Sequence, residues 1–389
     1  MVLSTIKLPS QTFIGWGSME RLDEGLQSMK SNKILLITDQ ILLDIGLLTP
    51  YMTPLQSKYR VEIYTDVEPE PTLACAQRLV DFARIEDFDC IVGIGGGSVL
   101  DLAKLAAVIS DNEGDVADYL NLTGTKPILR KGKQKILIPT TSGTGSEVTD
   151  IAVLSLDGTK DVITHKYLLS DLAIVDPQLT VSVPRRITAA TGVDALTHAI
   201  ESYLSVRAND VTDGIAIQAI KLIGGAIRRA VQNGETPEAR SAMSHGSYLA
   251  GLAFHNAGVA GVHALAYPLG SQYKLPHGES NAVLLPYVMD YIKEHCQDKM
   301  SHLVTMLGDE KQTPFEVFHQ LIEDVGLPVT LKEYGVKEAS LVGLSDDANK
   351  QTRLLARSPL PLNKDDILNI YQHAYKGVPL SREAGGRYV

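Results

Sequence analysis

Short apolar runs alternate with helix-like segments through the first half of the chain. Continuous runs of Ile, Leu and Val about five or six residues long are typical of parallel strands that are buried on both faces. Between these runs, apolar residues recur every three or four positions, as they do on one face of a helix. The alternation predicts a doubly wound parallel sheet. The predicted strands are Lys33–Thr38, Arg60–Thr65, Asp89–Ile94 and Lys135–Pro139, and the clearest predicted helices are Thr72–Ile85 and Val99–Ile109.

Three local signals lie outside these periodic segments. Ser18, followed by the acidic Glu20, predicts a helix start that is capped by the serine. Leu156-Asp157-Gly158 predicts a turn. The tail Ser381–Val389 contains Gly385 and Gly386, and we expect it to be a loosely held extension.

The pattern changes after Pro184, where strand-like alternation stops. Long segments with helical spacing follow at Ala190–Val206, Asp210–Asn233 and Pro237–His255, which predicts an all-α region. A chain of 389 residues is also too long for one ordinary hydrophobic core. We therefore expect an α/β domain at residues 1–182 and an all-α domain at residues 183–389, joined by a linker near residues 178–186.

The composition and net charge of the chain indicate which kind of molecule it binds. The chain is 44% hydrophobic and 21% charged, as expected of a globular protein. Its net charge of −10, without basic runs, argues against nucleic acid or an anionic membrane and favours a small-molecule partner. The first residues lack the features of a signal peptide and no apolar run is long enough to span a membrane, so we expect a cytoplasmic protein. Cys75, Cys90 and Cys296 form no CxxC pair, and we expect reduced packing residues.

Two glycine-rich loops follow predicted strands. The Gly95–Ser98 loop lies between a strand and a helix, where backbone N–H groups and the helix N-terminus can hold a phosphate. It lacks the GxGxxG spacing, and a plain tight turn is the alternative. The Thr140–Ser146 loop adds hydroxyl groups. Because parallel strands bring their carboxyl ends to one edge, both loops and Asp39 should meet there, which predicts a nucleotide site.

A second set of polar residues has the chemistry of a metal site. Asp194 and His198 are four residues apart in a helix-like run, a spacing that serves either a metal or a surface ion pair. His263 lies in an uncharged run of small residues, and His277 lies between Pro276 and a glycine. Each histidine alone is equally typical of a buried ring bonded to a backbone carbonyl. Together the four residues offer one oxygen and three nitrogen ligands without a thiolate, a set that suits Fe²⁺ or Zn²⁺.

Four segments in order carry a family resemblance. They are IGGGSVLDLAK at 94–104, PTTSGTGSEVT at 139–149, DALTHAIESYLS at 194–205 and HALAYPLGSQYKLPHGESNA at 263–282. The sequence resembles the iron-containing (group III) alcohol dehydrogenase family over roughly residues 10 to 375. That resemblance implies a dehydroquinate synthase-like architecture, in which a Rossmann-like sheet domain binds NAD(H), a helical domain binds the metal, and the active site lies between them.

The resemblance also implies residue roles. The implied metal ligands are Asp194, His198, His263 and His277. The implied cofactor-binding residues are Asp39, Gly96, Gly97, Ser98, Asp101, Thr140, Thr141, Thr144, Ser146 and Lys160. Asp39 should accept hydrogen bonds from a ribose 2′-OH and repel a 2′-phosphate, which favours NAD(H) over NADP(H). The implied reaction is hydride transfer between NAD(H) and a primary alcohol or aldehyde, with Fe²⁺, or alternatively Zn²⁺, as Lewis acid. We expect a homodimer or a higher homo-oligomer.

Two positions depart from the family pattern. Tyr267 stands where many members carry a histidine, and its hydroxyl is a candidate catalytic proton donor, with simple packing as the alternative. Glu70 occupies a slot where asparagine is common. Other functional classes are a dehydroquinate-synthase-like lyase, a relative of glycerol dehydrogenase with three protein ligands, and a non-catalytic binding protein.

The substrate prediction rests on a closer resemblance to 4-hydroxybutyrate dehydrogenases. It lies in Ala257–Val259, in the segment containing Tyr267, and in Gln351–Ala356. Arg353 and Arg357, one helical turn apart, are candidates to bind the carboxylate of 4-hydroxybutyrate or succinic semialdehyde. The alternatives are that both arginines are solvated and that the substrate is a short-chain alcohol, a diol or lactaldehyde.

Overall fold

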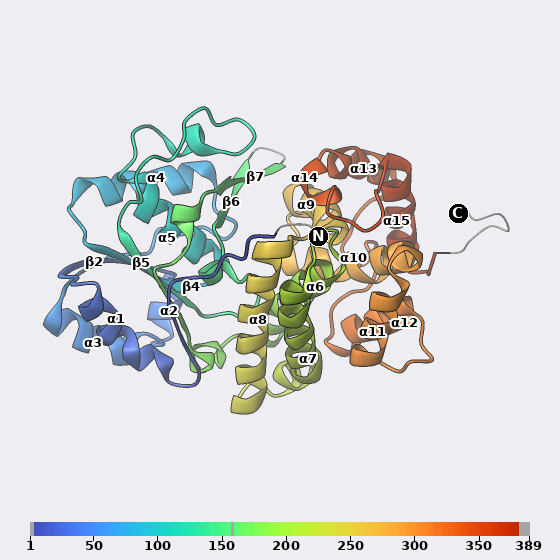
Figure 1. Cartoon of the computed structure of the whole chain (residues 1–389), viewed down its shortest axis with the longest axis horizontal. Coiled ribbons are helices and arrows are strands. Elements are labelled where there is room, and N and C mark those ends of the chain that lie inside the picture. Colours follow the sequence, from blue (N-terminus) through green and yellow to red (C-terminus); the bar gives the residue numbers. More distant parts are fainter. Residues whose placement is uncertain (1–3, 157–158, 381–389) are drawn as a thin grey trace. The chain divides into compact units, whose positions relative to one another are not determined.

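A computed structural model describes residues 4–156 and 159–380 (Figure 1). Of the turn predicted at Leu156-Asp157-Gly158, Asp157 and Gly158 lie outside these residues, as does the predicted tail Ser381–Val389. The chain forms two compact units, one comprising Lys7–Ser182 and the other extending from Val183 together with the residues up to Ile6. We propose that these two units are the folding domains of the protein.

The first unit is built on a parallel sheet with the strand order β1-β8-β5-β4-β2-β3. Register is regular along its centre, where Leu36 pairs with Val92 and Val92 with Ile136. The strands are β1 (Thr12–Ile14), β2 (Lys33–Thr38), β3 (Arg60–Tyr64), β4 (Cys90–Gly95), β5 (Gln134–Pro139) and β8 (Leu172–Val175). The parallel α/β prediction is therefore confirmed.

Helices cover both faces of this sheet. Leu35 and Ile37 of β2 pack on one face with α4 (Leu73–Ile85) and α5 (Gly97–Ile109). Ile34 and Leu36 pack on the other with α1 (Leu22–Ser28) and α3 (Thr49–Lys58). Successive side chains of a strand point to opposite faces, so an unbroken apolar run is needed to fill both layers.

The strand order places a topological switch point between β2 and β4. From β2 the chain passes to β3 on one side, whereas β4, β5 and β8 lie on the other. Ligands of doubly wound sheets bind outside the carboxyl ends of the strands at such a point. Asp39, between β2 and α2 (Gln40–Asp44), and Gly96, between β4 and α5, follow the two strands that flank it.

An antiparallel hairpin was not predicted from the sequence. It consists of β6 (Ile151–Leu156) and β7 (Thr159–Thr164), paired from Ile151–Thr164 to Leu156–Thr159. The serine cap predicted at Ser18 is wrong. Ser18 is buried in the first turn of a short 3-10 helix (Ser18–Arg21), and Gly17, with φ of 80°, takes the cap position.

The described residues of the second unit form helices joined by loops and turns, without a strand. Its helices are α6 (Arg185–Leu204), α7 (Asp210–Gln232), α8 (Pro237–Ala257), α9 (Gly261–Tyr273), α10 (His277–Ile292), α11 (Gln297–Leu307), α12 (Pro314–Asp324), α13 (Leu341–Asn349), α14 (Thr352–Leu355) and α15 (Lys364–Lys376). The helix predicted at Ala190–Val206 starts earlier, because Pro184 takes the cap position and Arg185 begins α6. The connection before α6 is accordingly shorter than the predicted linker.

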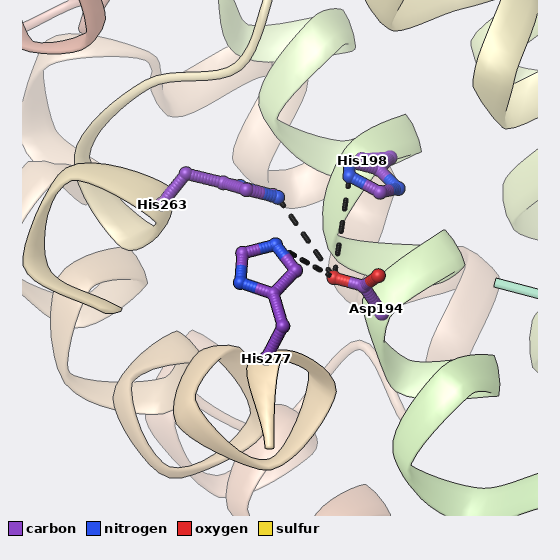
Figure 2. Close-up of side chains that lie close together, drawn as sticks. All are labelled: Asp194, His198, His263 and His277. Atoms are coloured by element: carbon purple, nitrogen blue, oxygen red, sulfur yellow. Dashed lines mark ion pairs between the residues drawn. The ribbon is translucent and has the colours of Figure 1, made fainter. Parts of the chain in front are cut away.

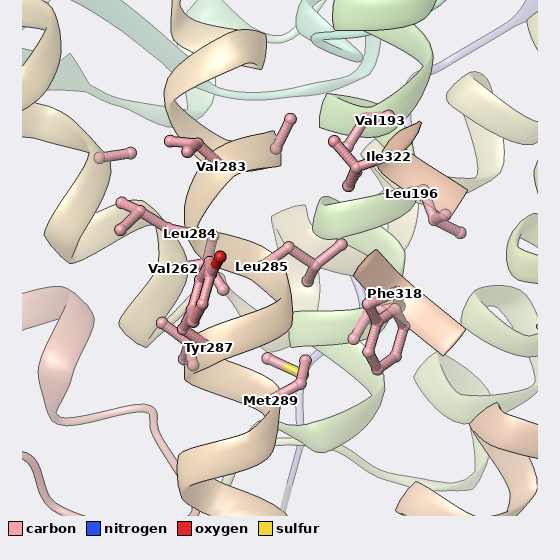
Figure 3. Close-up of a cluster of buried hydrophobic side chains, with 14 of the residues drawn as sticks. Val193, Leu196, Val262, Val283, Leu284, Leu285, Tyr287, Met289, Phe318 and Ile322 are labelled. Carbon is pink, nitrogen blue, oxygen red and sulfur yellow. The ribbon is translucent and has the colours of Figure 1, made fainter. Parts of the chain in front are cut away.

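The core of this unit joins helices that are distant in sequence. Val193 and Leu196 of α6, Leu285 of α10, and Phe318 and Ile322 of α12 are all fully buried in one cluster (Figure 3). This packing fixes α6 and α10 on which three of the four candidate ligands lie. Within the described residues, no single helix is long and apolar enough to cross a membrane; α8 and α9 meet that test only as a pair bent by 105°.

Candidate metal centre and nucleotide loops

Helix α6 provides the first two side chains of the metal cluster. Asp194 and His198, four residues apart on α6, point to the same side (Figure 2). Oδ1 of Asp194 lies 4.0 Å from Nε2 of His198, and both side chains are buried. The spacing therefore produces a convergent buried pair rather than a surface ion pair.

The other two histidines come from the starts of two further helices. His263 lies in the first turn of α9, with Nε2 3.8 Å from Oδ1 of Asp194. His277 is the first residue of α10, after Pro276 at the cap position, with Nε2 3.6 Å from the same oxygen. Three imidazole nitrogens thus surround one carboxylate oxygen (Figure 2).

The donor set fits a first-row divalent cation. The four ligand atoms lie within 4.8 Å of one another. Ligands about 2.1 Å from a tetrahedral ion are roughly 3.4 Å apart, so small side-chain shifts would complete the coordination. One carboxylate oxygen and three imidazoles, without a thiolate, suit Fe²⁺ or Zn²⁺.

Asn281 is a member of this cluster that the sequence prediction missed. Its Nδ2 donates to Oδ1 of Asp194 at 2.7 Å and lies 3.2 and 3.3 Å from Nε2 of His263 and of His277. Its Oδ1 is buried and has no hydrogen-bond partner among the described residues. Its position four residues after His277, on the same face of α10, is the signal that could have indicated it.

Electrostatics at Asp194 favour the ionised form that a metal requires. Burial by itself raises the pKa of this carboxyl group, but the three histidines and the hydrogen bond from Asn281 outweigh burial and leave the pKa below its usual value. A buried carboxylate is costly unless it is compensated by such partners. The surroundings of Asp194 therefore favour the carboxylate, which is the form that binds a metal.

Aromatic side chains surround the cluster. The Phe254 ring stacks on His198 with 4.4 Å between centroids, and His198 stacks on His263 at 4.7 Å. The half-buried Tyr267 ring lies 6.1 Å from that of His277. Phe254 therefore covers His198, whereas the Tyr267 ring lies near His277, the most exposed of the four candidate ligands.

The two candidate substrate arginines differ sharply in environment. Arg353 is exposed, whereas Arg357 is half-buried and packs on Gly258, whose φ of 84° and missing side chain leave room for the guanidinium group. Burial, followed by the nearby charges of Arg353 and Arg207, lowers the pKa of Arg357 to about 10, and interaction with Tyr267 partly opposes this. Among residues 4–156 and 159–380, no carboxylate pairs with Arg357.

The two nucleotide loops of the first unit are joined to each other. The amide of Thr140 donates to the carbonyl of Gly95 at 3.0 Å. A Cβ at Gly97 would lie 2.6 Å from the side chain of Thr144, and one at Gly96 would lie 3.9 Å from that of Thr141. The structure therefore brings together six of the predicted residues, Gly96, Gly97, Ser98, Thr140, Thr141 and Thr144. Gly96 is at the cap position of α5, and no side chain of the described residues caps this helix N-terminus.

Asp101 and Ser146 face each other instead of projecting from these loops. Asp101 accepts hydrogen bonds from Ser146 Oγ at 2.5 Å, from the fully buried Lys104 Nζ at 3.1 Å and from the amide of Val153 at 2.9 Å. Three protein donors therefore occupy the carboxylate. These bonds fix the Thr140–Ser146 loop to α5, and the cofactor-binding roles of Asp101 and Ser146 stay predictions.

Lys160 and Asp39 are the remaining residues that were predicted to bind the cofactor. Lys160 is buried in β7 and its Nζ lies 3.2 Å from Glu70 Oε2, while the amide of Glu70 donates to Ser98 Oγ at 3.1 Å. Glu70 has φ of 50°, in the left-handed region. Asp39 is half-buried without a side-chain partner among the described residues, and burial raises its pKa.

Comparison with known proteins identifies the class. Residues 9–177 match the profile of the iron-containing alcohol dehydrogenases, and residues 188–375 match the C-terminal region of the same family. The chain is 54% identical over 387 residues to long-chain-alcohol dehydrogenase 1 of Geobacillus thermodenitrificans, covering 97% of this chain and 98% of that one.

Solved structures agree over almost the whole chain. A 1,3-propanediol oxidoreductase superposes with a TM-score of 0.89 at 34% identity, covering 96% of this chain and 100% of the other. Sulfoacetaldehyde reductase from Bifidobacterium kashiwanohense in complex with NAD⁺ superposes with a TM-score of 0.88 at 28% identity, covering 96% and 99%. The protein belongs to the iron-containing alcohol dehydrogenase family. It is an oxidoreductase that uses NAD(H) and iron, as the sequence motifs predicted.

Proposed function

We propose that Asp194, His198, His263 and His277 bind Fe²⁺, with Zn²⁺ as an alternative, and that this centre serves hydride transfer between NAD(H) and a primary alcohol or aldehyde. The observation that carries this proposal is the convergence of four oxygen and nitrogen atoms within 4.8 Å. When bound, the metal supplies Lewis acidity, which polarises an aldehyde carbonyl or acidifies an alcohol.

The protein's own residues supply positioning and a proton. Tyr267 lies near His277 and interacts with Arg357, and we assign to its hydroxyl the donation of a proton during aldehyde reduction and its acceptance in the reverse direction. Phe254 and the stacked imidazoles limit the access of water to His198 and His263. In the first unit, the phosphate-binding role falls to the two joined loops, and Lys160 and Asp39 contact the remainder of NAD(H).

For the substrate, we propose a short ω-hydroxy acid and its semialdehyde, with 4-hydroxybutyrate and succinic semialdehyde first. The support is Arg357, a half-buried cation without an acidic partner among the described residues. A guanidinium in that setting suits a carboxylate. The structural relative that is named for sulfoacetaldehyde, an anionic aldehyde, favours the same substrate class.

A second candidate is a long-chain primary alcohol. The name of the 54% identical relative supports it, as does the aromatic surface that Phe254 adds beside His198. The family matches favour either dehydrogenase over a dehydroquinate-synthase-like lyase.

One assay separates these candidates. The Fe²⁺-loaded enzyme would be tested anaerobically for NADH oxidation with succinic semialdehyde, butanal and dodecanal. We expect the highest kcat/KM with succinic semialdehyde. A preference for dodecanal would select the second candidate, and absence of metal-dependent NADH oxidation with every aldehyde would refute the metal-centred mechanism.

We also propose a cytoplasmic homodimer or higher homo-oligomer. Ile14 and Trp16 are each 45% exposed, and Ile14 ends β1, which lies at the edge of the sheet. Exposed apolar residues on a sheet edge are typical of an interface. Light scattering on the purified full chain measures the mass, and a monomer at micromolar concentration would contradict the proposal.

A further inference from the structure

Glu201 is a buried carboxylate that contacts the candidate ligand His263 at the ring nitrogen that faces away from the ligand cluster. Its Oε2 lies 2.6 Å from Nδ1 of His263. The other nitrogen of that ring, Nε2, faces Asp194 at 3.8 Å. The imidazole is therefore held at one nitrogen while the second is directed to the ligand cluster.

The same carboxylate completes the start of α9. Glu201 accepts the amide of Ala260 at Oε2, at 2.9 Å, and that of Val262 at Oε1, at 2.6 Å. Ala260 occupies the cap position of α9 and has no side chain that could cap it. A carboxylate from α6 thus satisfies helix-start amides that would otherwise be buried without an acceptor. His263 lies in the turn that these bonds fix.

One face of α6 carries three residues that form or support the candidate metal centre. Asp194, His198 and Glu201 are spaced by four and three residues, which stacks them on one side of the helix. Two of them are candidate ligands, and the third supports a ligand from another helix. The sequence separation between Glu201 and His263 is 62 residues.

The chemistry of the contact determines the protonation of the ring. Both oxygens of Glu201 accept backbone amides and so act as acceptors, which assigns the proton of the 2.6 Å contact to Nδ1 of His263. Nε2 then keeps its lone pair, which is the form that binds a metal, and the anionic partner makes that nitrogen more basic.

We propose that Glu201 is a positioning residue that fixes the tautomer and orientation of His263 and thereby sets the metal affinity of the centre. This proposal rests on the metal site proposed above. Glu201 does not contact the ligand-facing side of the ring, so its effect passes through His263.

The first test leaves Glu201 unchanged. In metal-free protein labelled with ¹⁵N at histidine, imidazole NMR reports which nitrogen carries the proton, and loss of a resonance in His263→Ala assigns it. We expect His263 in the Nδ1–H form. An Nε2–H tautomer in the wild-type protein would overturn the proposal directly.

The second test uses Glu201→Gln, which preserves volume but replaces one acceptor by an N–H donor. Co²⁺ and Zn²⁺ affinities would be measured by chelator competition. We expect Kd to rise about 10- to 100-fold, the usual effect of losing such a partner, with a changed Co²⁺ absorption spectrum. Binding of NADH, which involves the first unit, should stay near the wild-type value.

The matched control is Glu279→Gln. Glu279 is 3% exposed against 2% for Glu201 and lies two residues after His277, but it pairs with Arg186 at 2.7 Å and not with a ligand ring. Its metal Kd should stay within about twofold of the wild-type value. Equal losses in both variants, or wild-type affinity in Glu201→Gln, would overturn the inference. A wild-type protein that binds neither metal would refute the metal site itself.

Discussion

Gly278 lies directly against the main chain of Ala190. A Cβ at position 278 would come within 2.2 Å of the carbonyl oxygen of Ala190, closer than any side chain can be. The start of α10 therefore touches α6 without an intervening side chain. This contact lies next to His277 and brings its Nε2 within 3.6 Å of Asp194.

Gly278→Ala should separate α6 from α10. Because the clash is with backbone, overpacking should cost about 1–3 kcal/mol and weaken metal binding as well. Thermal unfolding and metal content of the purified protein measure both effects. The matched control is Gly343→Ala in α13, where a Cβ meets nothing within 4 Å and helix propensity should leave stability equal or slightly higher. Equal stability and metal content in both variants would show that the contact at Ala190 is not required.

His277→Ala should remove one of four ligands while leaving most of the fold intact. The His277 side chain is 28% exposed, against 3–6% for the other ligands, so little core packing is lost. We expect bound metal to fall well below one equivalent and turnover to be largely lost. His319→Ala, outside the cluster in α12, is the control. Full activity of metal-free His277→Ala would contradict the assigned role.

The parts of this molecule that follow local patterns were predictable. β2 was predicted with its observed bounds, Lys33–Thr38, because a strand buried on both faces needs an unbroken apolar run. The hairpin β6–β7 was missed although its pairing is local, because β7 begins with the polar residues Thr159, Lys160 and Asp161 and lacks a clear strand pattern. No spacing rule could connect Glu201 with His263, since only the tertiary fold brings them together.

The site residues show the same limit. In the sequence, Arg353 and Arg357 are equivalent, but Gly258 makes room for only one of them. Asp101 lies in a motif that resembles a cofactor segment, yet its carboxylate is occupied by protein donors. Motif position therefore located the neighbourhood of these side chains but not their contacts.

Asp39 should determine the choice of cofactor. Its carboxylate follows β2 at the switch point, where it can accept hydrogen bonds from a ribose 2′-OH and would repel a 2′-phosphate. Asp39→Gly should lower the ratio of kcat/KM for NADH to that for NADPH by about tenfold or more, equivalent to roughly 1.4 kcal/mol. Steady-state kinetics with both cofactors give the ratio. An unchanged ratio, or a native preference for NADPH, would rule out this role.

Glu147 should make the stability of the first unit depend on pH. Burial raises the pKa of this carboxyl group to about 7 from 4.5. Between these values the folded state binds more protons than the unfolded chain, so stability should fall as pH rises from about 4.5 to 7, by up to roughly 3 kcal/mol. Glu147→Gln should flatten this dependence in thermal unfolding measured across that range. The exposed Glu310→Gln serves as the control, and parallel pH profiles for wild type and Glu147→Gln would disprove the assignment.

Arg357 should anchor an anionic substrate. It is half-buried beside Tyr267, and no carboxylate among the described residues neutralises it. A substrate carboxylate would supply that partner, whereas an uncharged aldehyde would not. Arg357→Ala should therefore raise KM for succinic semialdehyde about tenfold or more, equivalent to at least roughly 1.4 kcal/mol, and leave KM for butanal nearly unchanged.

Arg353→Ala is the matched control for Arg357, because it removes the same charge from an exposed position four residues earlier; Arg353 lies in α14, whereas Arg357 follows the end of that helix. If long-range attraction alone favoured the anion, both substitutions would raise KM for succinic semialdehyde to a similar extent. Added salt would then raise this KM for the wild-type enzyme as well. A direct, partly buried contact predicts a large effect at Arg357 only, with little dependence on salt. Equal losses on succinic semialdehyde and butanal in Arg357→Ala would instead indicate that this arginine supports Tyr267, and would leave the long-chain alcohol as the better substrate assignment.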